Sequence, residues 1–277
     1  MGGRPRRRGH PALSVGAGIV GLMTALAAFG PAVAQQDPQH EDFQHLLSPP
    51  DRTYLLGTDE LGRSTLARVL YGARVSLATS GLSTTAAILV GAPVGLLAGY
   101  RQGWFDAVSM RLTDGVLAFP GVLLAMLLIV AIGARPSSVV LALGVSFAPL
   151  FARTIRASTL TEREKEYVIA ARAVGGSLWH ILRRHLVPNV LDTLVVQATL
   201  CLGLCVLSEA TLSYLGLSAA PETPSWGRMV FEGQRILELA PSVTIVPLIA
   251  ISVTILGFNL LGNGLSDALD PQARPWS

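Results

Sequence analysis

The stretch Glu166–Asn189, which reads EYVIAARAVGGSLWHILRRHLVPN, decides how the rest of this chain is interpreted. It is polar and basic, and long apolar segments lie on both sides of it. Because charged side chains are costly at the centre of a bilayer, a charged and helix-prone stretch of this length belongs outside the membrane. The sequence therefore predicts apolar segments that cross a membrane and a loop between them that does not.

The composition of the whole chain agrees with a membrane protein. Of its 277 residues, 51% are hydrophobic and only 14% are charged, whereas about 25% charge is usual in a soluble domain. The net charge of +3 does not indicate nucleic-acid binding, because the arginines are spread over loops between apolar segments. Lys165 is the only lysine, so the sequence has no phosphate-binding loop of the GxxxxGK[ST] kind and does not bind ATP by that route.

Charge-free intervals predict the membrane-crossing helices. About 20 apolar residues cross a bilayer as a helix. The intervals 136–152 and 193–208 are short. The second of them becomes longer if its helix starts at Pro188, because proline suits a first helical turn. Asp192 and Glu209 then lie at opposite membrane interfaces. We predict an all-α integral membrane protein with six transmembrane helices, from the intervals 11–36, 75–100, 115–134, 136–152, 193–208 and 239–266.

The basic residues predict the orientation of these helices. With the N-terminus in the cytoplasm, 14 basic residues lie inside and seven outside, as the positive-inside rule requires. An alternative for the first span is a signal peptide cleaved after Ala34, which leaves the remaining topology unchanged. The predicted organisation is a cytoplasmic N-terminus (1–10), an N-terminal transmembrane helix (11–34), an extracytoplasmic segment (35–74), a five-helix core (75–266) that contains a cytoplasmic loop (154–187), and a cytoplasmic C-terminus (267–277).

Other residues narrow the class of protein. The last five apolar intervals hold no Asp, Glu, Lys, Arg or His, which argues against the alternative of an ion-gradient-driven secondary transporter, although backbone sodium sites remain open. The sequence contains neither GxSxG nor HExxH, so we expect no catalytic site, metal or cofactor. Cys201 and Cys205 are interpreted as small hydrophobes on one helix face. Gly91, Gly95 and Gly99 favour a close helix packing within the subunit over an interface with a partner subunit.

The first half of the loop predicts a short helix that ends in a glycine corner. Thr161 and Glu164 have the spacing of a capping box. The residues that follow are good helix formers as far as Val174. Gly175 and Gly176 then end the helix and permit a sharp turn.

The second half predicts another short helix, capped by Ser177, running through Arg184 and ending at Pro188. Two short helices at an angle, continued into a membrane helix, would transmit a push from another protein to the membrane-crossing core. A passive basic loop that lies on anionic lipid headgroups is the alternative. The residues alone favour neither interpretation.

The loop resembles the EAA loop of ABC-importer permeases, in which EAA is followed after three residues by glycine and later by I-x-L-P. Ala170, Ala171, Gly175 and Pro188 stand at matching positions. Ile169 replaces the glutamate, as is usual in the peptide-type branch, and His185 and Val187 replace the isoleucine and leucine. Further resemblance to the C-type permease subunit of the dipeptide/oligopeptide/nickel group lies in Tyr54–Leu77, Leu117–Met126, Leu212–Gln234 and Phe258–Pro271.

This resemblance implies the MetI-like core of a type I ABC importer in the inner membrane, serving dipeptides, oligopeptides or a related solute. It implies as partners a homologous second permease subunit, two ABC ATPase subunits that bind ATP and Mg, an extracytoplasmic solute-binding protein and the lipid bilayer. The chain itself would be a transport subunit and not an enzyme. Carried over by position, the ATPase-coupling element comprises Glu166, Tyr167, Ala170, Ala171, Arg172, Gly175, Gly176 and Pro188.

The solute-binding protein would need a landing surface on the two long outer segments. The best candidates are the Leu61-Gly62-Arg63 turn and the Trp226-Gly227 pair, because each combines a glycine with a side chain suited to an interface. A solvated loop is the alternative for each residue. The sequence does not select among dipeptides, oligopeptides, glutathione, haem and nickel complexes as the solute.

Overall fold

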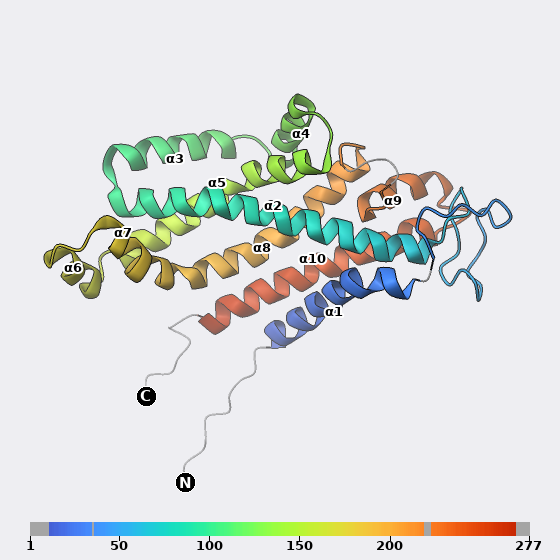
Figure 1. Cartoon of the computed structure of the whole chain (residues 1–277), viewed down its shortest axis with the longest axis horizontal. Coiled ribbons are helices and arrows are strands. Elements are labelled where there is room, and N and C mark those ends of the chain that lie inside the picture. The colour runs from blue at the N-terminus through green and yellow to red at the C-terminus, as the bar shows by residue number, and fades with distance from the viewer. Residues whose placement is uncertain (1–10, 35, 219–222, 270–277) are drawn as a thin grey trace, which may run out of the picture.

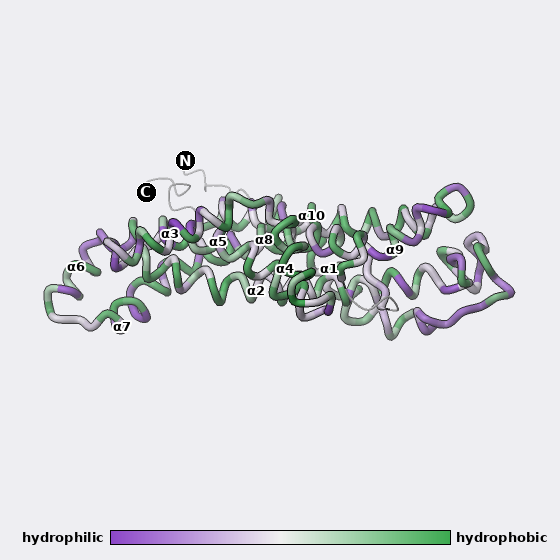
Figure 2. Tube along the Cα trace, turned by 90° about the horizontal axis from the view of Figure 1, so that it is seen from above, coloured by the Kyte–Doolittle hydropathy of each residue, from purple (hydrophilic) through white to green (hydrophobic). Residues whose placement is uncertain are grey.

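The computed structural model describes residues 11–34, 36–218 and 223–269, and the regular elements in these ranges are helices apart from one isolated bridge between Thr58 and Ser64. The predicted N-terminal segment 1–10 and residues 270–277 of the predicted C-terminal segment lie outside the described residues. Figure 1 shows the long helices side by side, with short helices at both ends of the bundle. Hydrophilic residues gather at those two ends and hydrophobic residues along the middle (Figure 2).

Five helices are long and apolar enough to cross a membrane. The helices run longer than the charge-free intervals because each continues through polar residues beyond its apolar part. Thus α2 begins at Thr65 rather than at residue 75. Its N-cap is Ser64, whose hydroxyl accepts a hydrogen bond from the Ala67 amide. The five are α1 (Pro11–Val33), α2 (Thr65–Arg101), α5 (Pro136–Glu162), α8 (Val187–Tyr214), which continues from Leu178 without a break, and α10 (Ser242–Leu269).

The interval 115–134 does not form one straight span, so this prediction is wrong. Instead α3 (Gly103–Leu117) and α4 (Gly121–Ile132) meet at an angle of 90°. Pro120 causes the break, since proline disfavours helical backbone in the residue before it and begins the next helix well. The sixth predicted crossing therefore corresponds to this bent pair, counted as one span.

The closest helix packing in the bundle joins α2 to α5. A Cβ atom at Gly91 would overlap the Ala148 carbonyl oxygen, and one at Gly95 would overlap that of Ala152. One turn further, a Cβ at Gly99 would lie 2.8 Å from the Thr159 Cβ. These glycines let the two backbones approach as the spacing predicted, and the contact lies within the subunit.

We expect Gly91→Val to disrupt the packing of α2 on α5, because the methyl groups of valine have no room beside the α5 backbone. The destabilisation should be about 3 kcal/mol. Gly81→Val is the matched control, because Gly81 lies on the same helix and nothing lies within 4 Å of a Cβ built there. The midpoint of thermal unfolding in detergent should fall for Gly91→Val and stay near wild type for Gly81→Val. Equal midpoints for the two variants would contradict a close α2–α5 contact.

The polar side chains of α8 were predicted with different success. Cys201 and Cys205 are buried and unbridged, in agreement with their interpretation as small hydrophobes. Glu209, by contrast, does not lie at an exposed interface. Its side chain is 0% exposed, and its Oε1 accepts a 2.7 Å hydrogen bond from the Ser213 hydroxyl. The sequence did not indicate this burial, since one of the groups near the Glu209 carboxylate is the Ser218 hydroxyl, 3.5 Å from Oε1 and beyond the end of α8.

Candidate functional site

The helical bend, defined as α6 (Glu166–Ala173), α7 (Leu178–Ile181) and the π-helical turn η1 (Leu182–Leu186), lies at one end of the bundle (Figure 1). The predicted capping box is wrong. Thr161 lies inside α5, where its hydroxyl donates to the Ala157 carbonyl, and α6 begins after Lys165 without a side-chain cap. Packing of α5 on α2 extends α5 past the position where local sequence starts a new helix.

The glycine corner of the bend is present as predicted. Gly175 has φ +82°, which favours glycine, and its amide donates a 2.9 Å hydrogen bond to the Arg172 carbonyl. The Gly176 amide donates to the Ala171 carbonyl at 3.0 Å, and a Cβ at Gly176 would lie 2.6 Å from the same oxygen. Ser177 then caps α7 by accepting from the His180 amide.

The second helix of the bend does not end at Pro188. Instead α7 passes through η1 directly into α8, whose first turn contains Pro188. Proline is tolerated there because a first-turn residue has no helical partner for its amide. The second half of the bend, α7 and η1, therefore forms one continuous helix with α8.

A small apolar core fixes the bend to the end of α2. Val168, Ile181 and Leu186 are buried against Leu97 and Tyr100 of α2. Two arginines add polar contacts. Arg163 donates to the Tyr100 carbonyl at 2.9 Å, and the Arg172 guanidinium lies over the Tyr100 ring, 4.8 Å from its centre. The bend therefore has little freedom to move independently of the helices below it.

Tyr167 joins the bend to the end of α5. Its hydroxyl donates to Oε1 of Glu162, whose Oε2 pairs with Lys165 at 2.6 Å. Burial, and then the hydrogen bond to the carboxylate, raise the pKa of Tyr167 to about 12. Both effects favour the neutral phenol.

We expect Tyr167→Phe to lower the stability of the bend by about 1 kcal/mol, the usual net value of one hydrogen bond. The folded-state pKa of about 12 lies above the ordinary value of 10.0, so this contribution is complete below pH 10 and is lost as the pH rises to 12. The difference in thermal unfolding midpoint between wild type and variant should narrow across that window. A difference that stays constant from pH 10 to 12 would contradict the pairing of Tyr167 with Glu162.

The outer face of the bend is uncovered. Among the predicted coupling residues, Ala171 and Gly176 are partly covered, and the exposed ones are Glu166, Tyr167, Ala170, Arg172, Gly175 and Pro188. Apolar side chains that sequence reasoning did not select lie beside them, namely Val174 at 86% and Trp179 at 70% exposure. A sequence signal for these two residues does exist. They are large apolar residues that remain after the buried face of each short helix has been assigned. Such a patch is typical of a surface that another molecule covers.

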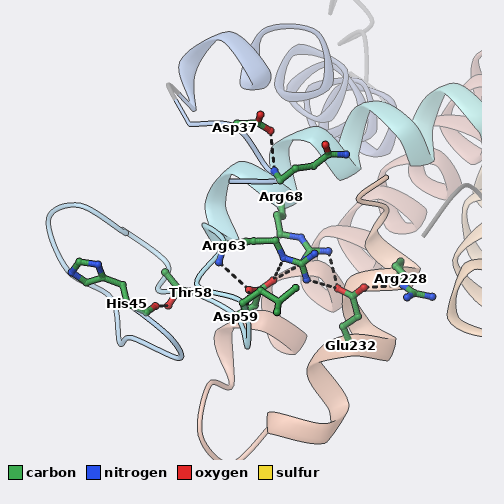
Figure 3. A network of polar contacts seen from close by, with 10 residues as sticks. Asp37, His45, Thr58, Asp59, Arg63, Arg68, Arg228 and Glu232 are labelled. Carbon is green, nitrogen blue, oxygen red and sulfur yellow. Dashed lines mark hydrogen bonds and ion pairs between the residues drawn. The ribbon is translucent and has the colours of Figure 1, made fainter. Parts of the chain in front are cut away.

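A cluster of ion pairs lies at the opposite end of the bundle, where the segment before α2 meets α9 (Trp226–Gly233) (Figure 3). Asp59 accepts from the Arg63 amide at 2.9 Å, from Arg63 Nε at 2.8 Å and from Arg68. Glu232 of α9 accepts from Arg68 Nη2 at 2.7 Å and from Arg228 Nε at 2.8 Å. This ion cluster binds α9 to the segment before α2.

The two candidate landing motifs have different surroundings. Leu61 is partly exposed. Gly62 has φ +73° and packs on the Asp42 backbone, and Arg63 belongs to the ion cluster. A cavity of about 370 Å³ lies beside this turn, lined by Glu41, Asp59, Glu60, Leu61, Arg63, Arg228, Glu232, Ile236 and Val243.

Trp226 and Gly227 correct the prediction, because both are buried in this structure. Trp226 is 1% exposed and donates to the Val69 carbonyl at 3.1 Å. A Cβ at Gly227 would overlap the Ala210 carbonyl of α8. The pair attaches α9 to α2 and α8 and presents no side chain to a landing protein. The residues resemble a typical interface pair, and only the folded chain distinguishes an internal contact from an external one.

Comparison with known proteins identifies relatives of the whole chain. The model of the family described as "Binding-protein-dependent transport system inner membrane component" matches residues 91–275. The glutathione transport system permease protein GsiD of Pectobacterium atrosepticum is 38% identical over 268 residues, covering 96% of this chain and 89% of that protein. GsiD of Escherichia coli strain UTI89 is 39% identical over 269 residues, covering 97% and 88% respectively.

Solved structures of similar fold agree with this. A chain of the MetNI methionine ABC transporter in an inward-facing conformation superposes with a TM-score of 0.57 at 19% identity. The match covers 72% of this chain and 96% of that one. A second crystal form of the same transporter gives a TM-score of 0.56 at 21% identity. At this identity the likeness extends to the fold.

Proposed function

This chain belongs to the family of binding-protein-dependent transport system inner membrane components and is a permease subunit of an ABC importer, and on that premise we propose that the helical bend is the element through which ATPase subunits drive it. The residues we assign to this contact are the exposed ones at the glycine corner and along α6. Val174, which is 86% exposed beside the glycine corner, extends the contact surface beyond the residues carried over by resemblance.

One observation supports this proposal above the others. The bend has its own apolar core against α2, its second half continues without interruption into α8, and it leaves Val174 uncovered beside the glycine corner. A flexible loop would absorb a push from outside. A fixed one passes displacement to α2 and α8, because packed elements move as units and not by continuous deformation.

The proposed assembly follows from the family. A homologous second permease subunit completes the membrane pathway, two ATPase subunits bind ATP and Mg and contact the bend from the cytoplasm, and an extracytoplasmic protein delivers the solute. In this arrangement the bend is cytoplasmic and the ion cluster faces outward, with both termini in the cytoplasm. The separation of bend and ion cluster to opposite ends of the bundle supports this orientation (Figure 1).

For the solute we propose glutathione or a similarly short peptide. The support is the glutathione transport for which the GsiD relatives are named, and these relatives match nearly the whole length of the chain. Within the described residues, no group of three or more His, Cys, Asp or Glu side chains is placed to hold a metal ion. A short peptide as solute is therefore compatible with a pathway that lacks a metal site of its own.

Reconstituted vesicles test this function. The chain, its partner permease, the ATPases and the delivery protein are assembled, and uptake of labelled glutathione is measured. We expect uptake to stop when ATP is removed and to continue when ionophores collapse the ion gradients. A cysteine introduced at exposed Ala170 should form a cross-link with an ATPase subunit. Uptake that needs an ion gradient, or a cross-link that never reaches an ATPase subunit, would refute the proposal.

Substrate and coupling are separable in the same preparation. If ATP-dependent transport is present but glutathione neither enters nor competes with a library of dipeptides, only the substrate assignment fails. Binding of glutathione to the isolated delivery protein gives the independent measurement, since specificity largely resides in that protein.

A further inference from the structure

An apolar groove of about 460 Å³ lies where the bend joins the membrane helices. Its walls are α2 between Ile88 and Leu96 and α8 between Val187 and Leu194. Trp179 and Arg183 close the end next to the bend, and Arg183 is the one charged residue of the lining. Its walls belong to helices that are long and apolar enough to cross a membrane, so hydrocarbon suits this groove better than water does.

A second, polar cavity of about 670 Å³ adjoins the groove and shares Trp179 and Arg183 with it. Its other lining residues are Ser177, His180, Arg184 and Pro188. An apolar slot and a basic pocket thus meet at one tryptophan and one arginine. Tryptophan is enriched at the level of lipid headgroups, where one end of the indole is apolar and the other is wet.

The basic pocket lacks acidic neighbours. The sequence contains neither aspartate nor glutamate from Val174 to Leu191. Within the part of the chain that the structure describes, neither Arg183 nor Arg184 has a carboxylate oxygen within 4.0 Å. Two exposed guanidinium groups without a counter-charge attract an anion, and the fork of N–H donors on arginine suits a phosphate group.

We propose that this junction binds an anionic phospholipid, with an acyl chain in the groove and the headgroup phosphate at Arg183 and Arg184. Basic pockets beside transmembrane helices on the cytoplasmic side are suited to such headgroups. An apolar partner helix in the groove would supply no counter-charge to Arg183 and Arg184, whereas a lipid headgroup supplies one. The junction would therefore join the lipid to the root of the bend, where α8 begins.

The lipid site takes its cytoplasmic placement from the proposed function but does not depend on the ATPase contact. The two interpretations of the basic loop, as a coupling element and as a loop that lies on anionic lipid headgroups, then apply to different faces of it. The corner and α6 face another protein, and the Arg183 side faces the membrane. Transport could be intact if the lipid site failed, and lipid binding could be intact if the coupling assignment failed.

Trp179 provides the probe. The full chain with its co-purifying subunits is reconstituted into phosphatidylcholine vesicles that contain a minor fraction of lipid brominated on its acyl chains. The brominated lipid is either phosphatidylglycerol or phosphatidylcholine. The signal of Trp179 is the difference between wild type and Trp179→Phe. We expect brominated phosphatidylglycerol to quench it preferentially, because each arginine contributes about fivefold to local enrichment of anionic lipid.

Three variants test the assignment. Arg183→Gln with Arg184→Gln should abolish the preference for phosphatidylglycerol. Arg101→Gln with Arg111→Gln is the matched control, which removes the same charge from exposed positions outside the groove and should retain the preference. Ala92→Phe keeps both arginines but narrows the groove, and should lower quenching by either brominated lipid.

The proposal is overturned by any of three results. Equal quenching by both lipids in wild type would show no anionic site. A preference that survives removal of Arg183 and Arg184 would place the site elsewhere. Absence of quenching by either lipid would mean that another subunit covers the groove.

Discussion

Gly175→Pro should abolish ATP-driven uptake while leaving the subunit inserted and folded. Proline fixes φ near −65° and has no amide hydrogen, whereas Gly175 has φ +82° and donates to the Arg172 carbonyl. Steric crowding by the proline ring would not explain the expected loss of uptake, since nothing lies within 4 Å of a Cβ built at Gly175. The chain would have to turn in a different direction at this corner, which would displace the residues of the proposed ATPase contact. A loss of only about 1.4 kcal/mol at that contact slows the transport cycle about tenfold.

Gly133→Pro is the matched control for this variant. Gly133 also has positive φ, at +97°, also has no atom within 4 Å of a built Cβ, and its amide also donates to a carbonyl, that of Ile129. It lies at the end of α4, away from the bend. Substrate-stimulated ATPase activity and uptake should both collapse for Gly175→Pro and persist for Gly133→Pro. Normal activity of Gly175→Pro would remove the bend from the drive mechanism.

Asp59→Ala should cause the largest loss of stability of any single change at the ion-cluster end of the bundle. Arg68, whose side chain is 3% exposed, pairs with both Asp59 and Glu232. Removing one partner of a buried ion pair costs about 3–5 kcal/mol, because the remaining charge stays buried without full compensation. The two hydrogen bonds that Asp59 accepts from the Leu61 and Arg63 amides are lost as well. We expect little folded protein after extraction from the membrane.

Glu60→Ala is the control for Asp59→Ala, because Glu60 is the adjacent residue and is exposed. Its unfolding midpoint should match that of the wild type. Asp59→Ala combined with Arg68→Met should recover part of the loss, since it replaces the unpaired charge by an apolar side chain of similar length. Full stability of Asp59→Ala alone would contradict a structural role for the ion cluster.

The two ends of the molecule are connected through α8. This helix begins in the bend and ends at Tyr214, where its last turns contact α9. The Tyr214 hydroxyl donates to Gln234 Oε1 at 2.6 Å, and Gly227 packs on Ala210. Because the ion cluster fixes α9 to the start of α2, a displacement of α8 at the bend reaches the ion-cluster end of the bundle through packed groups. We expect the movement that carries solute across the membrane to use this path.

By itself the sequence determined the features whose causes are local. The apolar intervals identified all five long helices, because the absence of charge over about 20 residues is a property of the segment alone. The turn at Gly175 and the cap at Ser177 were predicted for the same reason, since each depends on one residue and its immediate neighbours. The spacing of Gly91, Gly95 and Gly99 predicted close packing, although it did not identify α5 as the helix they pack against.

Only the tertiary structure decided the features that depend on residues far apart in the chain. Asp59 and Glu232 share Arg68, Trp226 is buried against α2, and the buried Glu209 carboxylate lies near the Ser218 hydroxyl beyond the end of its own helix. The same residue types on a surface would be interface groups, and local sequence does not distinguish the two cases. The free energy of a charge or an aromatic ring depends on what surrounds it, and those surroundings come from other segments that only the folded chain brings together.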